Sequence, residues 1–260
     1  MPESAWDPAE YERFRDERQA PFFDLLALVR SRPRMRVLDL GCGTGELTSV
    51  LHRRLEAAET LGIDRSDTML ARSAAFAAPG LRFVRRDIED VAGAERFDLV
   101  FSNAALQWVP GHEALLAALT RDLAPGGQMA VQMPANWDHP SHSVAAEVAG
   151  EAPFRDALGG WRRPARPVLA PEEYAALLHR LGYATQHVRL QVYGHVLGSA
   201  DDVVEWMRGS LLTAYRERLP AAGYEEFLAR YRERLGARLG EARPYFFTYK
   251  RVLLWAERPA

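Results

Sequence analysis

The feature that most restricts how this chain can fold is a glycine-rich run directly after a short apolar segment. Residues 35–40 read MRVLDL, which is typical of a buried strand, and residues 41–45 read GCGTG. Residues 45–55 then carry leucine and valine at helical spacing. A strand, a glycine turn and a helix in direct succession predict one unit of a parallel α/β sheet, with the helix amides facing a ligand at the turn.

The spacing of these glycines separates two classes of ligand. A dinucleotide-binding turn reads G-x-G-x-x-G, with its glycines facing a pyrophosphate. Here Gly41, Gly43 and Gly45 give G-x-G-x-G, and Glu46 occupies the place of the last dinucleotide glycine. A carboxylate there opposes a pyrophosphate, whereas Asp39 before the turn suits an ammonium group. The pattern favours S-adenosylmethionine (SAM), and a NAD-dependent oxidoreductase is the rival interpretation.

The chain continues to alternate between strands and helices. Strands are predicted at residues 60–64, 81–84, 97–102, 128–133, 186–196 and 246–257, and a helix at 171–181. Ser66 is the predicted N-cap of a further helix, and residues 122–127 (DLAPGG) predict a helix end followed by a tight turn. This alternation predicts an α/β fold with a parallel sheet.

Ligands of such sheets bind at the carboxyl ends of the strands, where further candidate residues lie. Asp64 ends one strand, where its carboxylate can accept from both ribose hydroxyls, and Arg65 follows it in the predicted cofactor site. After the next strand, Asp87 can accept from the adenine amino group while Ile88 packs on the ring. Residues 103–108 (NAALQW), from Asn103 to Trp108, follow the next strand at the mouth of the predicted cleft.

Two stretches interrupt the alternation and suggest how the chain is organised. Residues 138–170 are rich in proline and loop residues, and residues 199–244 are predicted to be helical, with one apolar stripe that we expect to be a packing face. We therefore expect a cofactor-binding core of residues 1–137, 171–198 and 245–260. The two interrupting stretches are then insertions that cover the substrate.

Composition argues against several partners. The net charge of −2 is unlike the basic field of nucleic-acid binders, and no apolar run approaches the roughly 18 residues of a membrane helix. A single cysteine, Cys42, and an acidic N-terminal segment favour a cytoplasmic protein without disulfides. No Cys/His or carboxylate cluster has metal-ligand spacing, so no metal is expected. Arg162, Arg163 and Arg166 are expected on the solvated surface.

Longer segments make the chain resemble a known family. They read WDPAEYERF, VLDLGCGTGELT, GIDRSDTMLA, NAALQWVPGHEALL and LAPGGQMAVQMPANWDHPSH. In these segments the chain is similar to trans-aconitate 2-methyltransferases, from Trp6 to about Val148 and again in the helix EEYAALLHRLG and the last strand. The resemblance implies a Rossmann-like class I methyltransferase with a seven-stranded, mostly parallel sheet, an antiparallel last strand and a helical cap.

The same resemblance implies a cofactor and its site. It implies SAM as cofactor and S-adenosyl-L-homocysteine as product. The matching cofactor positions are Asp39, Gly41, Gly43, Asp64, Asp87, Ile88 and Asn103. Tyr11 lies in an N-terminal helix that can fold over the cofactor as a lid in such enzymes.

The resemblance also implies methyl transfer to a carboxylate of a small organic acid, giving an ester. An ionised carboxylate needs no general base, so catalysis would rest on positioning in a site poor in water. Arg251 in the last strand is expected to orient the acid. The full set of predicted positioning residues is Arg251, His142, Trp137, Gln132, Asn136 and Tyr249. Trp108, Trp137 and the cap are candidates for closing the site.

One departure from the family pattern keeps other acceptors open. The family has an arginine shortly after the position of Trp206, where an arginine would clamp a carboxylate, and this chain has Thr213. The alternative acceptors are the carboxyl group of a malonyl thioester, an alcohol or an amine. An alcohol would need a base such as His112 or His142. A non-catalytic SAM-binding protein and a methyltransferase for nucleic acid or protein are further alternatives, and we expect a monomer or a homodimer.

Overall fold

The computed structural model describes residues 15–91, 96–163 and 168–260, with side chains from residue 19 onward. In chain order its elements are α2 (Arg15–Leu26), β1 (Arg36–Leu40), α3 (Glu46–Arg54), β2 (Glu59–Asp64), α4 (Asp67–Ser73), η1 (Ala74–Phe76), β3 (Leu81–Arg85), η2 (Ile88–Asp90), β4 (Phe97–Asn103), η3 (Leu106–Trp108), α5 (His112–Arg121), β5 (Leu123–Pro134), α6 (Pro140–Ala149), α7 (Phe154–Ala157), α8 (Pro171–Arg180), β6 (Thr185–Leu197), α9 (Asp201–Arg208), α10 (Thr213–Arg216), α11 (Ala221–Leu239) and β7 (Tyr245–Glu257). The η elements are short 3-10 helices.

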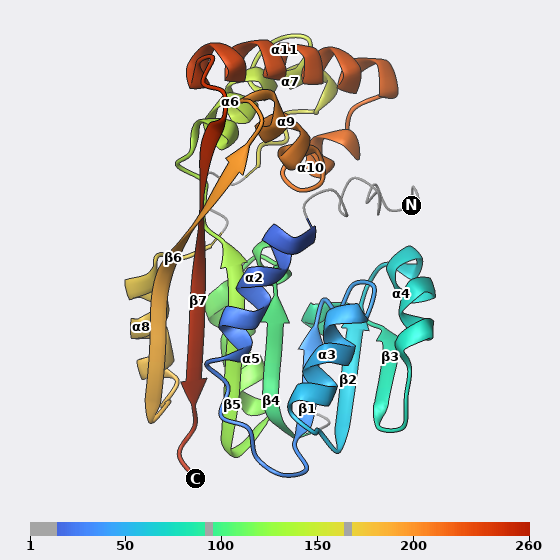
Figure 1. Ribbon diagram of the computed structural model, residues 1–260, viewed down its shortest axis with the longest axis vertical. Helices are drawn as coiled ribbons and strands as arrows, with labels where there is room; N and C mark the ends of the chain where they lie inside the picture. Colours follow the sequence, from blue (N-terminus) through green and yellow to red (C-terminus); the bar gives the residue numbers. More distant parts are fainter. Residues whose placement is uncertain (1–14, 92–95, 164–167) are drawn as a thin grey trace. The chain divides into compact units, whose positions relative to one another are not determined.

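The strands form one seven-stranded sheet in the order β3-β2-β1-β4-β5-β7-β6 (Figure 1). β1 pairs in parallel with β2 and β4, β2 with β3, and β4 with β5. β7 runs antiparallel to β5, with Leu254 opposite Val131. The sheet expected from the resemblance, mostly parallel with an antiparallel last strand, is confirmed.

The chain divides into two compact units, in each of which residues far apart in sequence come together. The sheet unit comprises residues 19–135, 167–191 and 251–260, and the helical unit comprises residues 1–18, 136–166 and 192–250. β6 and β7 contribute residues to both units.

Apolar side chains of α2 and α3 build a core on one face of the sheet unit. In Figure 1 these two helices cross in front of the strands. Phe22 and Leu25 of α2 and Leu51 of α3 are buried against Phe101 of β4 and Trp255 of β7. The rings of Phe22 and Phe101 meet edge to face, with centroids 5.4 Å apart. Burial of each such side chain stabilises the fold by about 1.5–3 kcal/mol.

The opposite face of the sheet unit is covered by α5 and α8, which lie behind the strands in Figure 1. Tyr174 of α8 is fully buried and its hydroxyl contacts the ring of His112 in α5. Tyr183 hydrogen-bonds to Thr120 of α5 at 2.9 Å. These four polar side chains are therefore paired, as burial requires, and they help to hold α5 and α8 against the strands.

The helical unit has a core of its own. The apolar stripe of α11 lies in it and consists of Tyr224, Phe227, Leu228, Tyr231 and Leu235. The Tyr231 hydroxyl donates a 3.0 Å hydrogen bond to the carbonyl of Ser141 in α6. The expected packing role of the stripe is confirmed. None of the helices in the described ranges is both long and apolar enough to cross a membrane.

Two local expectations are wrong. The stretch expected to be loop contains the ten-residue helix α6, because Pro140 can occupy the first helical turn and the His139 side chain caps it by accepting from the Ser141 amide. The tight turn expected within residues 122–127 is absorbed into β5, which begins at Leu123. A register shift opposite β4 accommodates the extra residues as a bulge, with Gly126 at φ 67°.

Candidate functional site

The glycines of the turn between β1 and α3 are required for two different reasons. Gly43 has φ 54°, and a Cβ built on it would meet nothing within 4 Å. Gly41 has φ 72°, and a Cβ there would lie 2.3 Å from the Cβ of Ala105. At Gly45 the space is filled by Ser73. Room for a ligand is therefore found beside Gly43, whereas Gly41 and Gly45 lack side chains because protein atoms occupy the space.

Asp39 lies under this turn and is 5% exposed. Its carboxylate accepts a 2.6 Å hydrogen bond from the Thr48 hydroxyl of α3. Burial raises the pKa of Asp39 to about 7, Thr48 lowers it, and the charge of Asp64 raises it further. A buried carboxylate gains from a cationic partner, so this position fits the ammonium group of an amino acid. Sequence reasoning missed Thr48, since its contact with Asp39 depends on how α3 packs on β1.

The Asp64 carboxylate ties the end of β2 to the glycine turn. One oxygen accepts the amide N–H of Gly43 and the other accepts that of Ser66, both at 2.9 Å. The Ser66 hydroxyl in turn accepts from the Met69 amide, which confirms the predicted N-cap. The side chain of Arg65 is exposed. The backbone carbonyl of Arg65 accepts a hydrogen bond from the guanidinium of Arg85 in β3.

The end of β3 brings an apolar side chain to the same turn. The terminal carbon of Ile88 lies 3.9 Å from the point that a Cβ on Gly41 would occupy, so Ile88 borders the turn. Asp87, directly before it, is exposed at the start of η2, and Trp108 is half-buried in η3. A ligand beside Gly43 would therefore have an apolar wall on the β3 side.

A chain of hydrogen bonds joins three neighbouring strands. The guanidinium of Arg251 in β7 donates to the side-chain oxygen of Gln132 in β5 at 3.0 Å. The amide nitrogen of Gln132 donates to the side-chain oxygen of Asn103 in β4 at 2.7 Å. Arg251 is 6% exposed and Gln132 is fully buried. The structure thus brings together a predicted acceptor residue, Arg251, and a predicted cofactor residue, Asn103, through Gln132.

The residue after Asn103 is strained, which sequence reasoning also missed. Ala104 has φ 58°, a left-handed conformation that is unusual for alanine. Its amide donates to the Gln132 carbonyl at 2.9 Å, and its carbonyl accepts from the Gln107 side chain at 2.6 Å. These bonds hold the chain in a sharp change of direction at the end of β4, and strain of this kind is common at functional sites.

Two more predicted residues lie in the turn that precedes α6. Asn136 is buried, and its side-chain oxygen accepts the Lys250 amide N–H at 3.1 Å. Its amide nitrogen is buried without a hydrogen-bond partner among the described residues. Trp137 is half-buried beside it. A bound acceptor oxygen would satisfy the Asn136 donor, which favours a polar contact there.

His142 and His112, the two candidate general bases, are poorly suited to removing a proton from an acceptor. His142, in the first turn of α6, has its pKa lowered to about 3, mainly by burial and then by the positive charges of Arg163 and His139. His112 has its pKa lowered by burial, and its two ring nitrogens contact the Tyr174 hydroxyl and the Leu106 carbonyl. A general base works best with a pKa near the working pH, so neither ring is matched to removing a proton.

Tyr249 lies in an aromatic cluster of the helical unit. Its ring centroid is 5.7 Å from that of Trp206 and 5.6 Å from that of Phe247. Arg163 is half-buried and interacts electrostatically with Tyr249 and Tyr215. Because Arg163 is half-buried, the expectation of a solvated surface is wrong for it. The expectation holds for exposed Arg162, and Arg166 lies outside the described residues.

Thr213, where the resemblance implied an arginine, is not an anion-binding group. It is 3% exposed and begins α10. Its hydroxyl donates a 2.6 Å hydrogen bond to the Ser210 carbonyl. This bond satisfies the hydroxyl proton locally, so Thr213 offers no donor comparable to a guanidinium.

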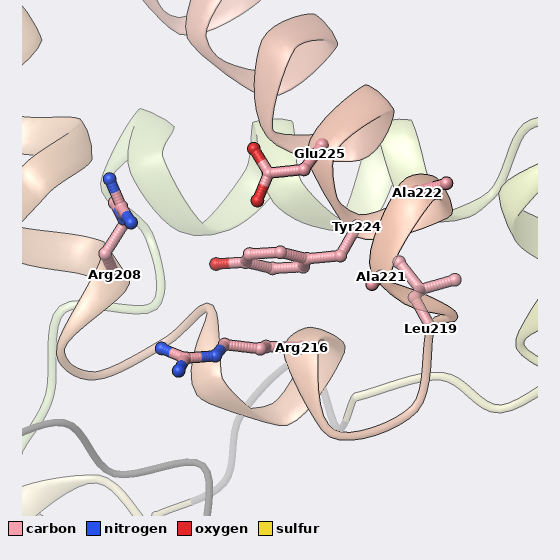
Figure 2. A pocket seen from close by; sticks show the side chains of 7 residues that line it. All are labelled: Arg208, Arg216, Leu219, Ala221, Ala222, Tyr224 and Glu225. Atoms are coloured by element: carbon pink, nitrogen blue, oxygen red, sulfur yellow. The ribbon is translucent and has the colours of Figure 1, made fainter.

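A cavity of about 640 Å³ opens in the helical unit between α9, α10 and α11. Figure 2 shows the Tyr224 hydroxyl pointing between the guanidinium groups of Arg208 and Arg216, with the Glu225 carboxylate above the ring. Glu205 pairs with Arg208 at 3.3 Å. The Glu225 carboxylate lines the cavity together with the two guanidinium groups, and Glu205 pairs with one of them, so the charge of the cavity does not select an anion.

Two remaining expectations concern ligands. Tyr11, the predicted lid residue, lies outside the described residues. Within the described ranges, no group of three or more His, Cys, Asp or Glu side chains could hold a metal ion.

Comparisons with known proteins identify the class. Residues 37–127 match the family described as "Methyltransferase domain". A SAM-dependent methyltransferase from Mesorhizobium loti has a TM-score of 0.51 at 23% identity, covering 92% of this chain and 98% of its own. Phosphoethanolamine N-methyltransferase 2 of Haemonchus contortus, in complex with SAM, has a TM-score of 0.56 at 15% identity, covering 93% of this chain and 53% of its own. The fold is that of a SAM-dependent methyltransferase, not of a NAD-dependent oxidoreductase.

Curated relatives define the family more closely. Trans-aconitate 2-methyltransferase of Deinococcus radiodurans is 45% identical over 259 residues, covering 98% of both chains. The Streptomyces avermitilis protein of the same name is 40% identical over 264 residues, again covering 98% of both. The chain belongs to the trans-aconitate 2-methyltransferase family.

Proposed function

We propose that this protein transfers the methyl group of SAM to a carboxylate of a small organic acid, with trans-aconitate as the first candidate acceptor. The observation that carries the proposal is the buried guanidinium of Arg251, held at 3.0 Å by Gln132, which is itself bonded to Asn103. A fixed, buried guanidinium is suited to a carboxylate. Relatives at 40–45% identity that are named trans-aconitate 2-methyltransferase support this choice of acceptor.

The proposed cofactor site lies in the sheet unit. Asp39 would pair with the ammonium group of SAM, the open space beside Gly43 would admit its amino-acid part, and Asp64 would accept from the ribose hydroxyls. The full proposed set is Asp39, Gly41, Gly43, Gly45, Asp64, Arg65, Asp87, Ile88, Asn103 and Trp108, with Tyr11 as a lid. Bound SAM supplies an electrophilic methyl group on a sulfonium sulfur.

The chemistry of the described histidines supports a carboxylate acceptor over an alcohol. A carboxylate is ionised at neutral pH, so no proton has to be removed before attack. An alcohol needs a base, and the pKa of His142, about 3, is far too low for one. The work left to the protein is to hold the acceptor oxygen in line and to exclude water.

Several residues of the helical unit are proposed to act on the acceptor. Asn136 would donate its buried amide, His142 would offer a neutral ring, and Trp137 and Tyr249 would supply apolar walls that exclude water. We further propose that residues 138–170 and 199–244 cover the substrate. A cytoplasmic monomer or homodimer that binds neither nucleic acid nor membranes completes the proposal.

The proposal is tested by offering acceptors to the purified protein and measuring S-adenosyl-L-homocysteine. The panel holds trans-aconitate, other small carboxylic acids, a malonyl thioester, an alcohol and an amine, and SAM binding is measured in parallel. Turnover on free acids supports the proposal. Turnover restricted to the alcohol or the amine overturns it, and SAM binding without turnover on any acceptor indicates a non-catalytic binder.

A further inference from the structure

Thr48, the third residue of α3, is not part of the proposed cofactor site, although it contacts one of the residues of that site. Its side chain is fully buried, and its hydroxyl donates a 2.6 Å hydrogen bond to one oxygen of Asp39. We propose that Thr48 is a positioning residue for SAM, which keeps Asp39 ionised and orients it toward the ammonium group of the cofactor. The inference rests on the proposed function, since it needs the pairing of Asp39 with that ammonium group.

The strands beside Asp39 give its carboxylate an apolar setting. In the sheet, Asp39 is paired with Gly62 of β2, which has no side chain, and with Phe101 of β4, which is fully buried. Val37, two residues earlier on the same face of β1, packs in one core with Phe101 and with Leu51 of α3. Asp39 therefore faces α3, and a polar partner has to come from that helix.

The geometry of α3 places the Thr48 hydroxyl where this partner is needed. Thr48 lies three residues before Leu51, so both side chains are on the side of the helix that faces the sheet. Threonine is branched at Cβ and has few rotamers, which fixes the position of its hydroxyl. A carboxylate can accept at both oxygens, so the bond to Thr48 orients Asp39 and leaves the second oxygen for a ligand.

The other ionisable groups around Asp39 disfavour its charged form. Burial raises the pKa of Asp39 to about 7, the Thr48 hydrogen bond lowers it, and the negative charge of Asp64 in β2 raises it further. Cys42 in the glycine turn stays a neutral thiol, because burial and then the charges of Asp39 and Asp64 raise its pKa. Of these groups, the Thr48 hydroxyl alone stabilises the carboxylate, so its loss should leave Asp39 protonated at neutral pH.

Three variants of the full chain isolate the hydroxyl. Thr48→Val removes it and keeps the shape of the side chain, whereas Thr48→Ser keeps it. Thr120→Val is the matched control, since Thr120 is a buried threonine of α5 whose hydroxyl donates to the Leu116 carbonyl at 2.7 Å. The affinity for S-adenosyl-L-homocysteine is measured by calorimetry between pH 6 and pH 9. Each value is divided by that of the unaltered protein at the same pH, so that the ionisation of the ligand cancels.

The expected result is a loss of affinity that depends on pH. A hydrogen bond to a charged group corresponds to a change of about one to two pH units in the ionisation of Asp39. Thr48→Val should therefore bind S-adenosyl-L-homocysteine roughly 10- to 100-fold more weakly at pH 6 and nearly as tightly as the unaltered protein at pH 9. Thr48→Ser should recover most of the affinity at pH 6, and Thr120→Val should show no loss at any pH.

A shortened ligand separates positioning from a structural role. 5′-Methylthioadenosine lacks the amino-acid part of the cofactor, so Thr48→Val should bind it as the unaltered protein does. In an Asp39→Asn background, Thr48→Val should cause no loss that depends on pH. If Thr48→Val weakens both ligands equally, or weakens S-adenosyl-L-homocysteine by the same factor at every pH, Thr48 has a structural role and the inference is wrong.

The same measurements separate this inference from the proposed function. If Asp39→Asn binds S-adenosyl-L-homocysteine as tightly as the unaltered protein at pH 8, the pairing of Asp39 with the ammonium group fails and this inference fails with it. If Asp39→Asn weakens binding but Thr48→Val behaves like Thr120→Val, the pairing stands and this inference alone fails. If the pH-dependent loss is found but no acid is methylated, the inference stands and the proposed methyl transfer fails.

Discussion

At the level of single residues, the burial of Asp39 carries an electrostatic cost that a cationic ligand would relieve. The carboxylate is 5% exposed, receives one hydrogen bond from Thr48 and has its pKa raised to about 7. Below that pH it is largely protonated in the folded protein, and above it a poorly solvated charge has to be tolerated. A cationic ligand should therefore stabilise Asp39 most at neutral pH and above.

Replacing Asp39 with asparagine should change how stability depends on pH. A carboxyl group with a raised folded-state pKa binds its proton more tightly when folded, so the free energy of unfolding falls as pH rises from about 4 to about 7. The shift corresponds to a loss on the order of 4 kcal/mol. Asp39→Asn should remove this loss, so the variant should gain stability relative to the unaltered protein between pH 5 and pH 8.

Urea unfolding of both proteins at pH 5 and at pH 8, without SAM, would measure this difference in the free energy of unfolding. Calorimetry should show that Asp39→Asn weakens SAM binding at pH 8, although the free protein is more stable there. An equal change in unfolding free energy at pH 5 and pH 8 would mean that Asp39 does not titrate in this range.

The two turn glycines should respond differently to alanine. Gly43→Ala strains a φ of 54° in open space, so it should cost about 1–2 kcal/mol of stability and weaken SAM binding at least tenfold. Gly41→Ala should destabilise more, because its Cβ would lie 2.3 Å from that of Ala105. Gly111→Ala is a matched control, with φ 69° and nothing within 4 Å, at the start of α5. If Gly111→Ala weakens SAM binding as much as Gly43→Ala, the open space beside Gly43 is not the cofactor's.

At the level of elements, the site depends on the order of β4, β5 and β7. The adjacency of these strands places Asn103, Gln132 and Arg251 in one line of hydrogen bonds. Gln132 uses its oxygen toward the arginine and its nitrogen toward the asparagine, which fixes the orientation of its amide. A change at Gln132 should therefore be felt at both neighbours.

Gln132→Met removes both hydrogen bonds and keeps the side-chain size similar. It should lower the free energy of unfolding by about 1–3 kcal/mol and raise KM for the acid roughly tenfold or more. Gln128→Met is the matched control, since Gln128 is also fully buried, lies four residues earlier in β5 and bonds to Trp255 and the Arg30 backbone. Denaturant unfolding should show similar destabilisation for the two variants. Steady-state kinetics should show a raised KM for Gln132→Met alone. Equal KM values would contradict a role for Gln132 in holding Arg251.

At the level of the whole molecule, sequence patterns predict the features that depend on residues close together in the chain. They do not predict the features that depend on how distant segments pack. The turn, the Ser66 cap and the strands follow from spacing and composition within short windows. The helix α6 was missed because proline is typical of loops, although Pro140 is tolerated in a first helical turn. The bonds of Thr48 and Gln132 and the half-burial of Arg163 depend on contacts between distant segments.

The same distinction applies to the functional residues. Asp39 and Gly43 could be proposed from sequence because a cofactor turn is a local structure. Arg251 could also be proposed as an acceptor residue, from the resemblance to a known family. The three-dimensional arrangement adds that Gln132 holds the guanidinium of Arg251 and that the candidate bases are unsuited to proton removal. The central claim is therefore that the methyl group goes to an oxygen that is already ionised.

The most direct test follows the methyl group itself. The protein is incubated with trans-aconitate and SAM labelled in its methyl group, and the product is isolated and treated with mild alkali. The account predicts one S-adenosyl-L-homocysteine per labelled monomethyl ester, with alkali releasing the label as methanol and regenerating trans-aconitate. A labelled product that resists alkali, or trans-aconitate left unmethylated by protein saturated with SAM, would contradict it.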